Sequence, residues 1–148
     1  MSRKNAREIA LHLIFEYGFG TFEAANVREE RLSEEIMSLI SGEISLYAGK
    51  LSDAQTSYIV SVVTGVADHL EELDNTIRDT AQGWSFKRLS RITVAILRLA
   101  IYEMRYVEDV PTGVAINEAV ELAKVYDSSE AASFINGVLG TVSRAAEA

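Results

Sequence analysis

Apolar residues recur every three or four positions along most of the chain, which is the spacing of amphipathic helices. The pattern predicts a first helix over residues 4–17, a second over 29–48, and a third that begins near Ser52. The third continues to Ile77, about seven turns. Ser52 and Gln55 have the spacing of a capping box, in which each side chain bonds the backbone N–H of the other residue.

The C-terminal half predicts three more helices, over residues 86–107, 112–126 and 129–145. From Ile92 to Tyr102 nearly every residue is apolar, so we expect this helix in the middle of a bundle, covered on several sides. The only proline, Pro111, separates it from the next helix. The fold class is therefore all-α, a single-domain bundle of six or seven helices over residues 1–148.

Composition limits the classes of function. The chain has no cysteine, which excludes thiol nucleophiles, disulfides and thiolate zinc sites and is compatible with a reducing cytoplasm. A net charge of −8 argues against broad, non-specific nucleic-acid binding, although a local basic patch is compatible with it. The uncharged apolar stretch from Ile92 to Leu97 is too short to cross a bilayer, and no signal peptide is present. We therefore expect a cytoplasmic protein.

The residues that usually perform catalysis occur here without a catalytic arrangement. His12 and His69 lack the spacing that would pair either with a second ligand or a nucleophile. Glu71 and Glu72 are neighbours on a predicted helix and point in different directions, so they form no dyad. No P-loop, nucleophile elbow or dinucleotide motif is present. We expect no enzyme activity, no cofactor and no metal site.

Basic residues gather in two clusters that contain no acid. Arg3, Lys4 and Arg7 share the first turns of the first helix, where they could present three charges together. The second cluster spans twelve residues and consists of Lys87, Arg88, Arg91 and Arg98. Ordinary solubility explains both clusters, and so does a phosphate-contacting patch with stacking or hydrogen-bonding side chains nearby. Composition alone leaves these two interpretations open.

Several polar residues call for a structural interpretation. Arg98 interrupts an apolar run, where an unpaired guanidinium would be costly, so we expect an ion pair rather than an RNA contact. Its candidate partners are Glu103, Glu118 and Glu121. Asn117 and Asn136 interrupt apolar faces and are expected to make hydrogen bonds that link helices. The acids opposite the apolar stripe of the third helix are expected to form a solvated face: Asp68, Glu71, Glu72 and Asp74.

Three motifs follow one another in the C-terminal half: ILRLAIYE from Ile96 to Glu103, VAINEAVELAK from Val114 to Lys124, and FINGVL from Phe134 to Leu139. Together with Val110-Pro111 they closely resemble the NusB family of transcription antitermination factors. The opening segment from Arg3 to Leu11 is also similar to that family, and so are residues in the middle of the sequence: Tyr58, Gly65, Val66, Leu73, Asp74, Ile77 and Trp84. The resemblance covers nearly the whole protein.

The resemblance implies an all-α fold of two helical sub-bundles and a function without chemistry. It implies binding to the boxA RNA element of ribosomal RNA leader transcripts together with NusE, a small-subunit ribosomal protein. These partners act in an RNA polymerase antitermination complex that helps the polymerase pass terminators. No membrane partner is implied.

The resemblance also assigns individual residues. Arg3, Lys4 and Arg7 match the family's basic, RNA-contacting N-terminus, and Phe134 matches an aromatic position near the RNA surface. With Lys87, Arg88 and Arg91 from the second basic cluster, they form the expected RNA-binding set. Phe15 stands where the family usually has a tyrosine near the NusE contact, and Thr93 stands where it commonly has an acid that is associated with a charged NusE contact.

Two substitutions depart from the family pattern. Thr93 replaces that acid, and Asn5 replaces what is often another basic residue. With the net charge of −8, they favour a second hypothesis, a helical protein–protein adaptor whose RNA binding has weakened. A partner that changed in step explains them equally well. A third hypothesis is a homodimer, since apolar surface kept for a partner can pair with itself when that partner is absent.

Overall fold

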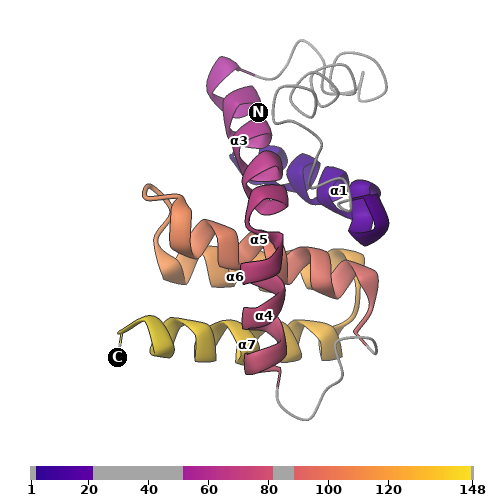
Figure 1. The fold of residues 1–148 in the computed structure, drawn as a ribbon, viewed down its shortest axis with the longest axis vertical. Coiled ribbons are helices and arrows are strands. Elements are labelled where there is room, and N and C mark those ends of the chain that lie inside the picture. The colour runs from indigo at the N-terminus through magenta and orange to yellow at the C-terminus, as the bar shows by residue number, and fades with distance from the viewer. Residues whose placement is uncertain (1–2, 22–51, 82–88, 148) are drawn as a thin grey trace. The chain divides into compact units, whose positions relative to one another are not determined.

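The computed structural model of the protein describes residues 3–21, 52–81 and 89–147, and the side chains of 5–16, 52–81 and 89–146 (Figure 1). Every regular element in these ranges is a helix, which confirms the all-α class for the described part of the protein. The helix predicted over 29–48 lies outside it. The described helices fall into two compact units, Met1–Asp68 and His69–Ala148.

The first unit contains α1 (Arg3–Thr21) and α3 (Asp53–Asp68), which pack against one another. The predicted capping box is confirmed at the start of α3. The Ser52 backbone N–H donates to Gln55 Oε1 at 2.9 Å, and the Gln55 N–H donates to Ser52 Oγ at 3.1 Å. Helix α1 continues past its predicted end near residue 17, so its two glycines do not terminate it.

The third predicted helix is interrupted at His69. Helix α3 ends at Asp68, α4 (Leu70–Thr80) follows, and His69 lies between them as a turn. The apolar repeat continues through Leu70, Leu73 and Ile77 without a glycine or proline, so periodicity could not predict this break.

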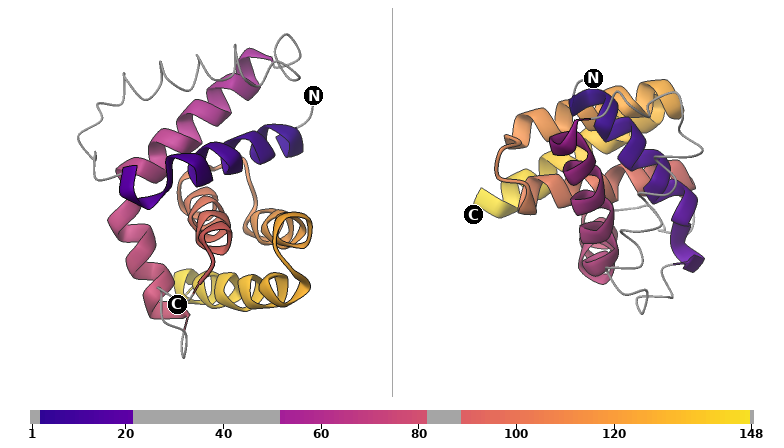
Figure 2. Two further views of the ribbon diagram at one scale, coloured as in Figure 1. Left: turned by 90° about the vertical axis from the view of Figure 1, so that its right-hand side faces the viewer. Right: turned by 90° about the horizontal axis from the view of Figure 1, so that it is seen from above.

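The second unit contains α4, α5 (Arg91–Tyr106), α6 (Thr112–Tyr126) and α7 (Ser129–Glu147). Helix α5 contacts α4, α6 and α7, and α6 packs against α7 (Figure 2). All eleven residues from Thr93 to Glu103 are buried, which confirms that α5 is covered on several sides. None of the helices in the described ranges is both long and apolar enough to span a membrane.

Helix α5 begins five residues later than periodicity predicts, because Ser90 caps it. The Thr93 backbone N–H donates to Ser90 Oγ at 3.1 Å. A hydroxyl at this position satisfies one of the N–H groups that a helix start leaves without a partner. The bounds of α6 match the prediction, and α7 extends two residues beyond it.

Candidate functional site

A hydrogen-bond network joins the start of α5 to the end of α6. The Thr93 hydroxyl donates to Asp127 Oδ2 at 2.5 Å, and the Ser90 hydroxyl donates to the same oxygen at 3.0 Å. Thr93 is only 4% exposed, whereas Asp127 is exposed. Thr93 therefore lies inside the unit and donates to a carboxylate at the surface.

Arg91 is an exposed cation at this end of α5. It is the first residue of the helix and follows the capping Ser90. A helix start carries a partial positive charge from its unpaired N–H groups, which adds to the charge of a nearby guanidinium. The Asp127 carboxylate, bonded to Ser90 and Thr93, brings a negative charge to the same helix start. The neighbouring members of the predicted cluster, Lys87 and Arg88, lie outside the described residues.

Arg7 lies in the interior rather than on the surface. Its side chain is 4% exposed, and its guanidinium carbon lies 6.0 Å from the centroid of the Tyr58 ring on α3. Arg7 shares one helix face with Ala10, Leu11 and Ile14, all buried, and this spacing turns it inward. The prediction that Arg7 presents its charge at the surface with Arg3 and Lys4 is therefore wrong for Arg7. The side chains of Arg3 and Lys4 lie outside the described ones.

Arg98 forms the predicted structural ion pair, but with a residue that the sequence did not suggest. Its Nε and Nη2 atoms donate to the two carboxylate oxygens of Asp74 on α4, both at 2.7 Å. Sequence periodicity assigned Asp74 to a solvated face, and that assignment is wrong, because this side chain is 13% exposed. Arg98 itself is 1% exposed, so the second basic cluster does not offer it to a phosphate.

A second polar bridge also joins α4 to α5, in the part of the unit that solvent reaches. Glu72 accepts hydrogen bonds from the Tyr106 hydroxyl at 2.6 Å and from Arg105 Nη1 at 2.8 Å. The Tyr106 ring lies 4.3 Å from the His69 ring and 5.2 Å from the Tyr102 ring, measured between centroids. Glu72 is thus exposed but bonded, whereas its neighbour Glu71 is exposed as predicted.

The Glu72–Tyr106 hydrogen bond predicts a pH-dependent contribution to stability. It lowers the pKa of Glu72 below its ordinary 4.5, with Arg105 acting in the same direction, and it raises the pKa of Tyr106 above 10. A carboxyl whose pKa is lower in the folded than in the unfolded state stabilises the folded state at pH values above its unfolded-state pKa. This contribution is lost as the pH falls through the folded-state pKa. We expect Tyr106→Phe to lower the free energy of unfolding at pH 6 and to have less effect at pH 3. Urea unfolding at both pH values measures this, and an equal loss at both would contradict it.

The two aromatic residues assigned by the resemblance are partly exposed. Phe134 lies on α7 and Phe15 on α1, each of intermediate burial. Both are thus accessible enough for a contact while still anchored by their own helices. The residues expected to bind RNA or NusE therefore include members of both units.

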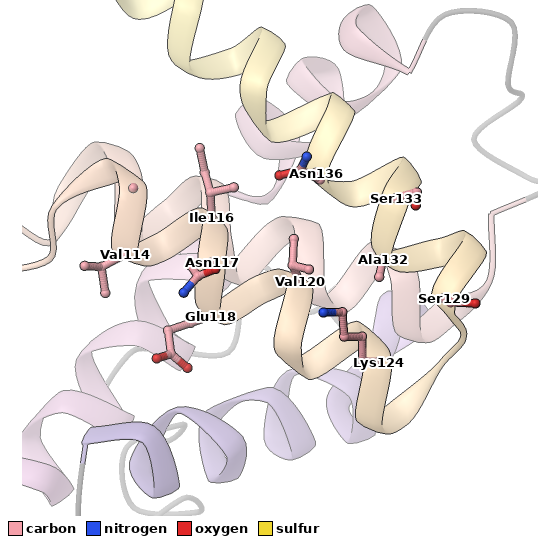
Figure 3. Close-up of a pocket in the computed structure, with 11 residues that line it drawn as sticks. Val114, Ile116, Asn117, Glu118, Val120, Lys124, Ser129, Ala132, Ser133 and Asn136 are labelled. Carbon is pink, nitrogen blue, oxygen red and sulfur yellow. The ribbon is translucent and has the colours of Figure 1, made fainter.

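Asn117 and Asn136 lie opposite one another across a groove between α6 and α7, shown in Figure 3. The groove has a volume of about 700 Å³, and its lining includes Ile116, Asn117, Val120, Ala132, Ser133 and Asn136. We call it the α6–α7 groove. Both carboxamides are exposed, and neither makes a hydrogen bond within the part of the protein that the structure describes. The prediction that Asn117 and Asn136 make hydrogen bonds linking helices is therefore wrong.

The described residues include no group of three or more His, Asp or Glu side chains that could hold a metal ion. His12 is exposed, and His69 lies at the boundary between α3 and α4. Sequence reasoning did not find the roles of Asp74 and Asp127, because each accepts hydrogen bonds from a helix that is distant in the sequence. Ser90, three residues before Thr93, is the one local signal that could have located the start of α5.

Comparison with known proteins gives one consistent result. A sequence model described as the NusB family matches residues 4–144. The transcription antitermination protein NusB of Clostridium botulinum (strain Kyoto / Type A2) is 39% identical over 144 residues, covering 95% of this chain and 98% of that protein. Its counterpart from Acetivibrio thermocellus is 42% identical over 142 residues, covering 96% of this chain and 88% of that protein.

Solved structures show the same fold. T. maritima NusB matches with a TM-score of 0.76 and 26% identity, covering 97% of this chain and 92% of that one. A protein from a complex of the antitermination factors NusB and NusE with double-stranded RNA matches with a TM-score of 0.74 and 24% identity. That match covers 97% of this chain and 96% of the other.

Proposed function

Because this chain belongs to the NusB family, we propose that it is a non-enzymatic transcription antitermination factor that binds boxA RNA together with NusE. The observation that carries the proposal is identity of 39–42% to antitermination proteins over at least 95% of this chain. A related fold occurs in a complex with NusE and RNA, which supports the same two partners here. The proposed site of action is the RNA polymerase antitermination complex in the cytoplasm.

The RNA-binding residues that we propose come from both basic clusters. Arg91 supplies an exposed cation at a helix start, and Phe134 supplies a partly exposed ring on which a base can stack. Arg3, Lys4, Lys87 and Arg88 complete the cationic set by sequence. Arg7, buried against Tyr58, is proposed to position α1 rather than to touch a phosphate.

Replacement of Arg91 by alanine tests the phosphate contact. If Arg91 neutralises one phosphate, Arg91→Ala weakens binding to a boxA-like RNA and lowers the slope of log K against log salt concentration by about 0.7–1. Fluorescence anisotropy at several salt concentrations measures that slope. The matched control is Arg78→Ala, which removes an exposed arginine from α4. A slope that stays unchanged in Arg91→Ala would contradict the phosphate contact.

Replacement of Arg7 by alanine separates the two roles considered for that residue. Since Arg7 packs on Tyr58, we expect Arg7→Ala to lower the free energy of unfolding by about 1–2 kcal/mol and to leave the salt slope of RNA binding unchanged. Chemical denaturation and the same anisotropy titration provide both readouts. Glu16→Ala, at an exposed position of α1, is the control for stability. A flatter slope with unchanged stability would instead make Arg7 an RNA contact.

The NusE-binding residues are proposed to include Phe15 and those beside Thr93, where Asp127 supplies the exposed acid. Size-exclusion chromatography with light scattering tests the pairing directly. A 1:1 complex with NusE from the same source is expected. A concentration-dependent mass of twice that of the monomer, without NusE binding, would favour the homodimer. NusE binding without any RNA binding would favour the protein-only adaptor, which the charge of −8 motivates.

A further inference from the structure

Asp127 lies where the ends of three helices of the second unit meet. It follows the last residue of α6, and its carboxylate accepts the hydroxyls of Ser90 and Thr93 at the start of α5. The next residue, Ser128, caps α7, because its Oγ accepts the backbone N–H of Ala131 at 3.0 Å. We call these four residues the Asp127 junction: Ser90, Thr93, Asp127 and Ser128.

The side-chain hydrogen bonds of the Asp127 junction join segments that are distant in the sequence. Thr93 lies 34 residues before Asp127, and Ser90 lies 37 residues before it. Both hydroxyls bond the same oxygen, Oδ2, and a hydrogen bond to a carboxylate is stronger than one between neutral groups. Because Thr93 is buried, removal of the carboxylate would deprive a buried hydroxyl of this acceptor. The carboxylate therefore holds the start of α5 against the end of α6.

The Asp127 junction also lies between two residues of the proposed RNA-binding set. Arg91 directly follows Ser90, and Phe134 lies six residues after Ser128, in the second turn of α7. A strand that contacts a cation with a phosphate and stacks a base on a ring needs both groups at one fixed separation. The position of the α5 start relative to the α7 start sets that separation, and the Asp127 junction connects these two helix starts.

We propose that Asp127 is a positioning residue for RNA binding. Through the Ser90 and Thr93 hydroxyls it holds the start of α5 so that Arg91 and Phe134 contact one RNA strand together. The proposal rests on the proposed function and deepens it, because it gives a residue outside the RNA-binding set control over the geometry of two residues within that set.

The charge of Asp127 and its positioning role predict opposite effects on RNA binding. A carboxylate near a phosphate repels it, so if charge alone mattered, every neutral replacement of Asp127 would tighten RNA binding. Exposed charges are screened over about 10 Å at 0.1 M salt, and two hydroxyls already direct their protons at this carboxylate. We therefore expect the loss of geometry to outweigh the loss of repulsion when the carboxylate is deleted.

Fluorescence anisotropy of a boxA-like RNA, titrated with the full-length protein without NusE, tests the proposal. Asp127→Ala is expected to lower the slope of log K against log salt concentration by about 0.7–1, which equals about five- to tenfold weaker binding at 0.1 M salt. Asp127→Asn removes the charge but keeps an oxygen that accepts both hydroxyls, so it is expected to bind RNA at least as tightly as the unaltered protein. The control, Glu121→Ala, removes an exposed acid from α6 and is expected not to weaken RNA binding.

Two further variants separate positioning from a general effect on stability. Thr93→Val deletes a hydroxyl of the Asp127 junction without changing any charge, and it is expected to lower the salt slope in the same direction as Asp127→Ala. Since Asp127 acts through Arg91, the double variant Asp127→Ala, Arg91→Ala is expected to weaken binding by less than the product of the two separate effects. A purely structural role would change the free energy of unfolding, measured with urea, and leave the salt slope unaltered.

Three results would overturn the proposal. The first is that Asp127→Ala tightens RNA binding or keeps the full salt slope. The second is that Asp127→Asn weakens binding as much as Asp127→Ala, and the third is that the double variant shows the full product of the two effects. All three leave RNA binding by the unaltered protein intact. Absence of that binding, with and without NusE, would reject the proposed function itself and this inference with it.

Discussion

Asp74→Ala is expected to lower the free energy of unfolding by about 3–5 kcal/mol, because it leaves the Arg98 guanidinium buried without its carboxylate. The Arg98 side chain is 1% exposed and that of Asp74 is 13% exposed, so water cannot readily replace the lost partner. Burial lowers the pKa of Arg98, and the hydrogen bonds that Arg98 donates to Asp74 oppose that shift. Removal of the acid therefore removes the main group that stabilises the charge.

Urea unfolding of Asp74→Ala, monitored by circular dichroism, measures this loss. Glu71→Ala removes an exposed acid from the same helix and is expected to change the free energy of unfolding by less than about 0.5 kcal/mol. The double variant Asp74→Leu, Arg98→Met removes both charges and is expected to recover most of the loss. If Asp74→Ala were no more destabilising than Glu71→Ala, the ion pair would not be the link between α4 and α5 that the geometry indicates.

Leu97→Ala is expected to lower the free energy of unfolding by about 2–5 kcal/mol, since Leu97 is fully buried at the centre of α5. The loss combines the transfer free energy of the deleted methyl groups with the cavity that they leave, and α5 contacts α4, α6 and α7 around it. Val125→Ala removes an aliphatic side chain that is 67% exposed and provides the control, with an expected change below about 0.5 kcal/mol. Denaturant titration compares the two, and equal losses would contradict a core centred on α5.

Local patterns predicted most of the described helices. Periodicity located α6 at its observed bounds, the Ser52–Gln55 spacing located the start of α3, and the continuous apolar run predicted the burial of α5. These features depend on residues within a few turns of one another. The break at His69 has no glycine or proline to mark it, so the repeat on either side reads as one helix.

The candidate site was predictable in residue type but less so in placement. Arg7 belongs to an acid-free basic cluster, and only its spacing to Ala10, Leu11 and Ile14 indicates the buried side of α1. Asp74 shows the same limit, because its partner Arg98 is 24 residues away and on another helix. Composition shows which charged residues the protein has. It does not show whether they face solvent, because that depends on how the helices pack.

Fluorescence anisotropy tests most directly whether this protein binds boxA RNA together with NusE. A labelled boxA-like RNA is titrated with this protein in the presence and absence of NusE from the same source, with a scrambled RNA of equal length as the control. The proposed function predicts tighter binding when NusE is present, and loss of that binding with the scrambled RNA. Absence of RNA binding under both conditions, with NusE shown to bind this protein, would contradict it.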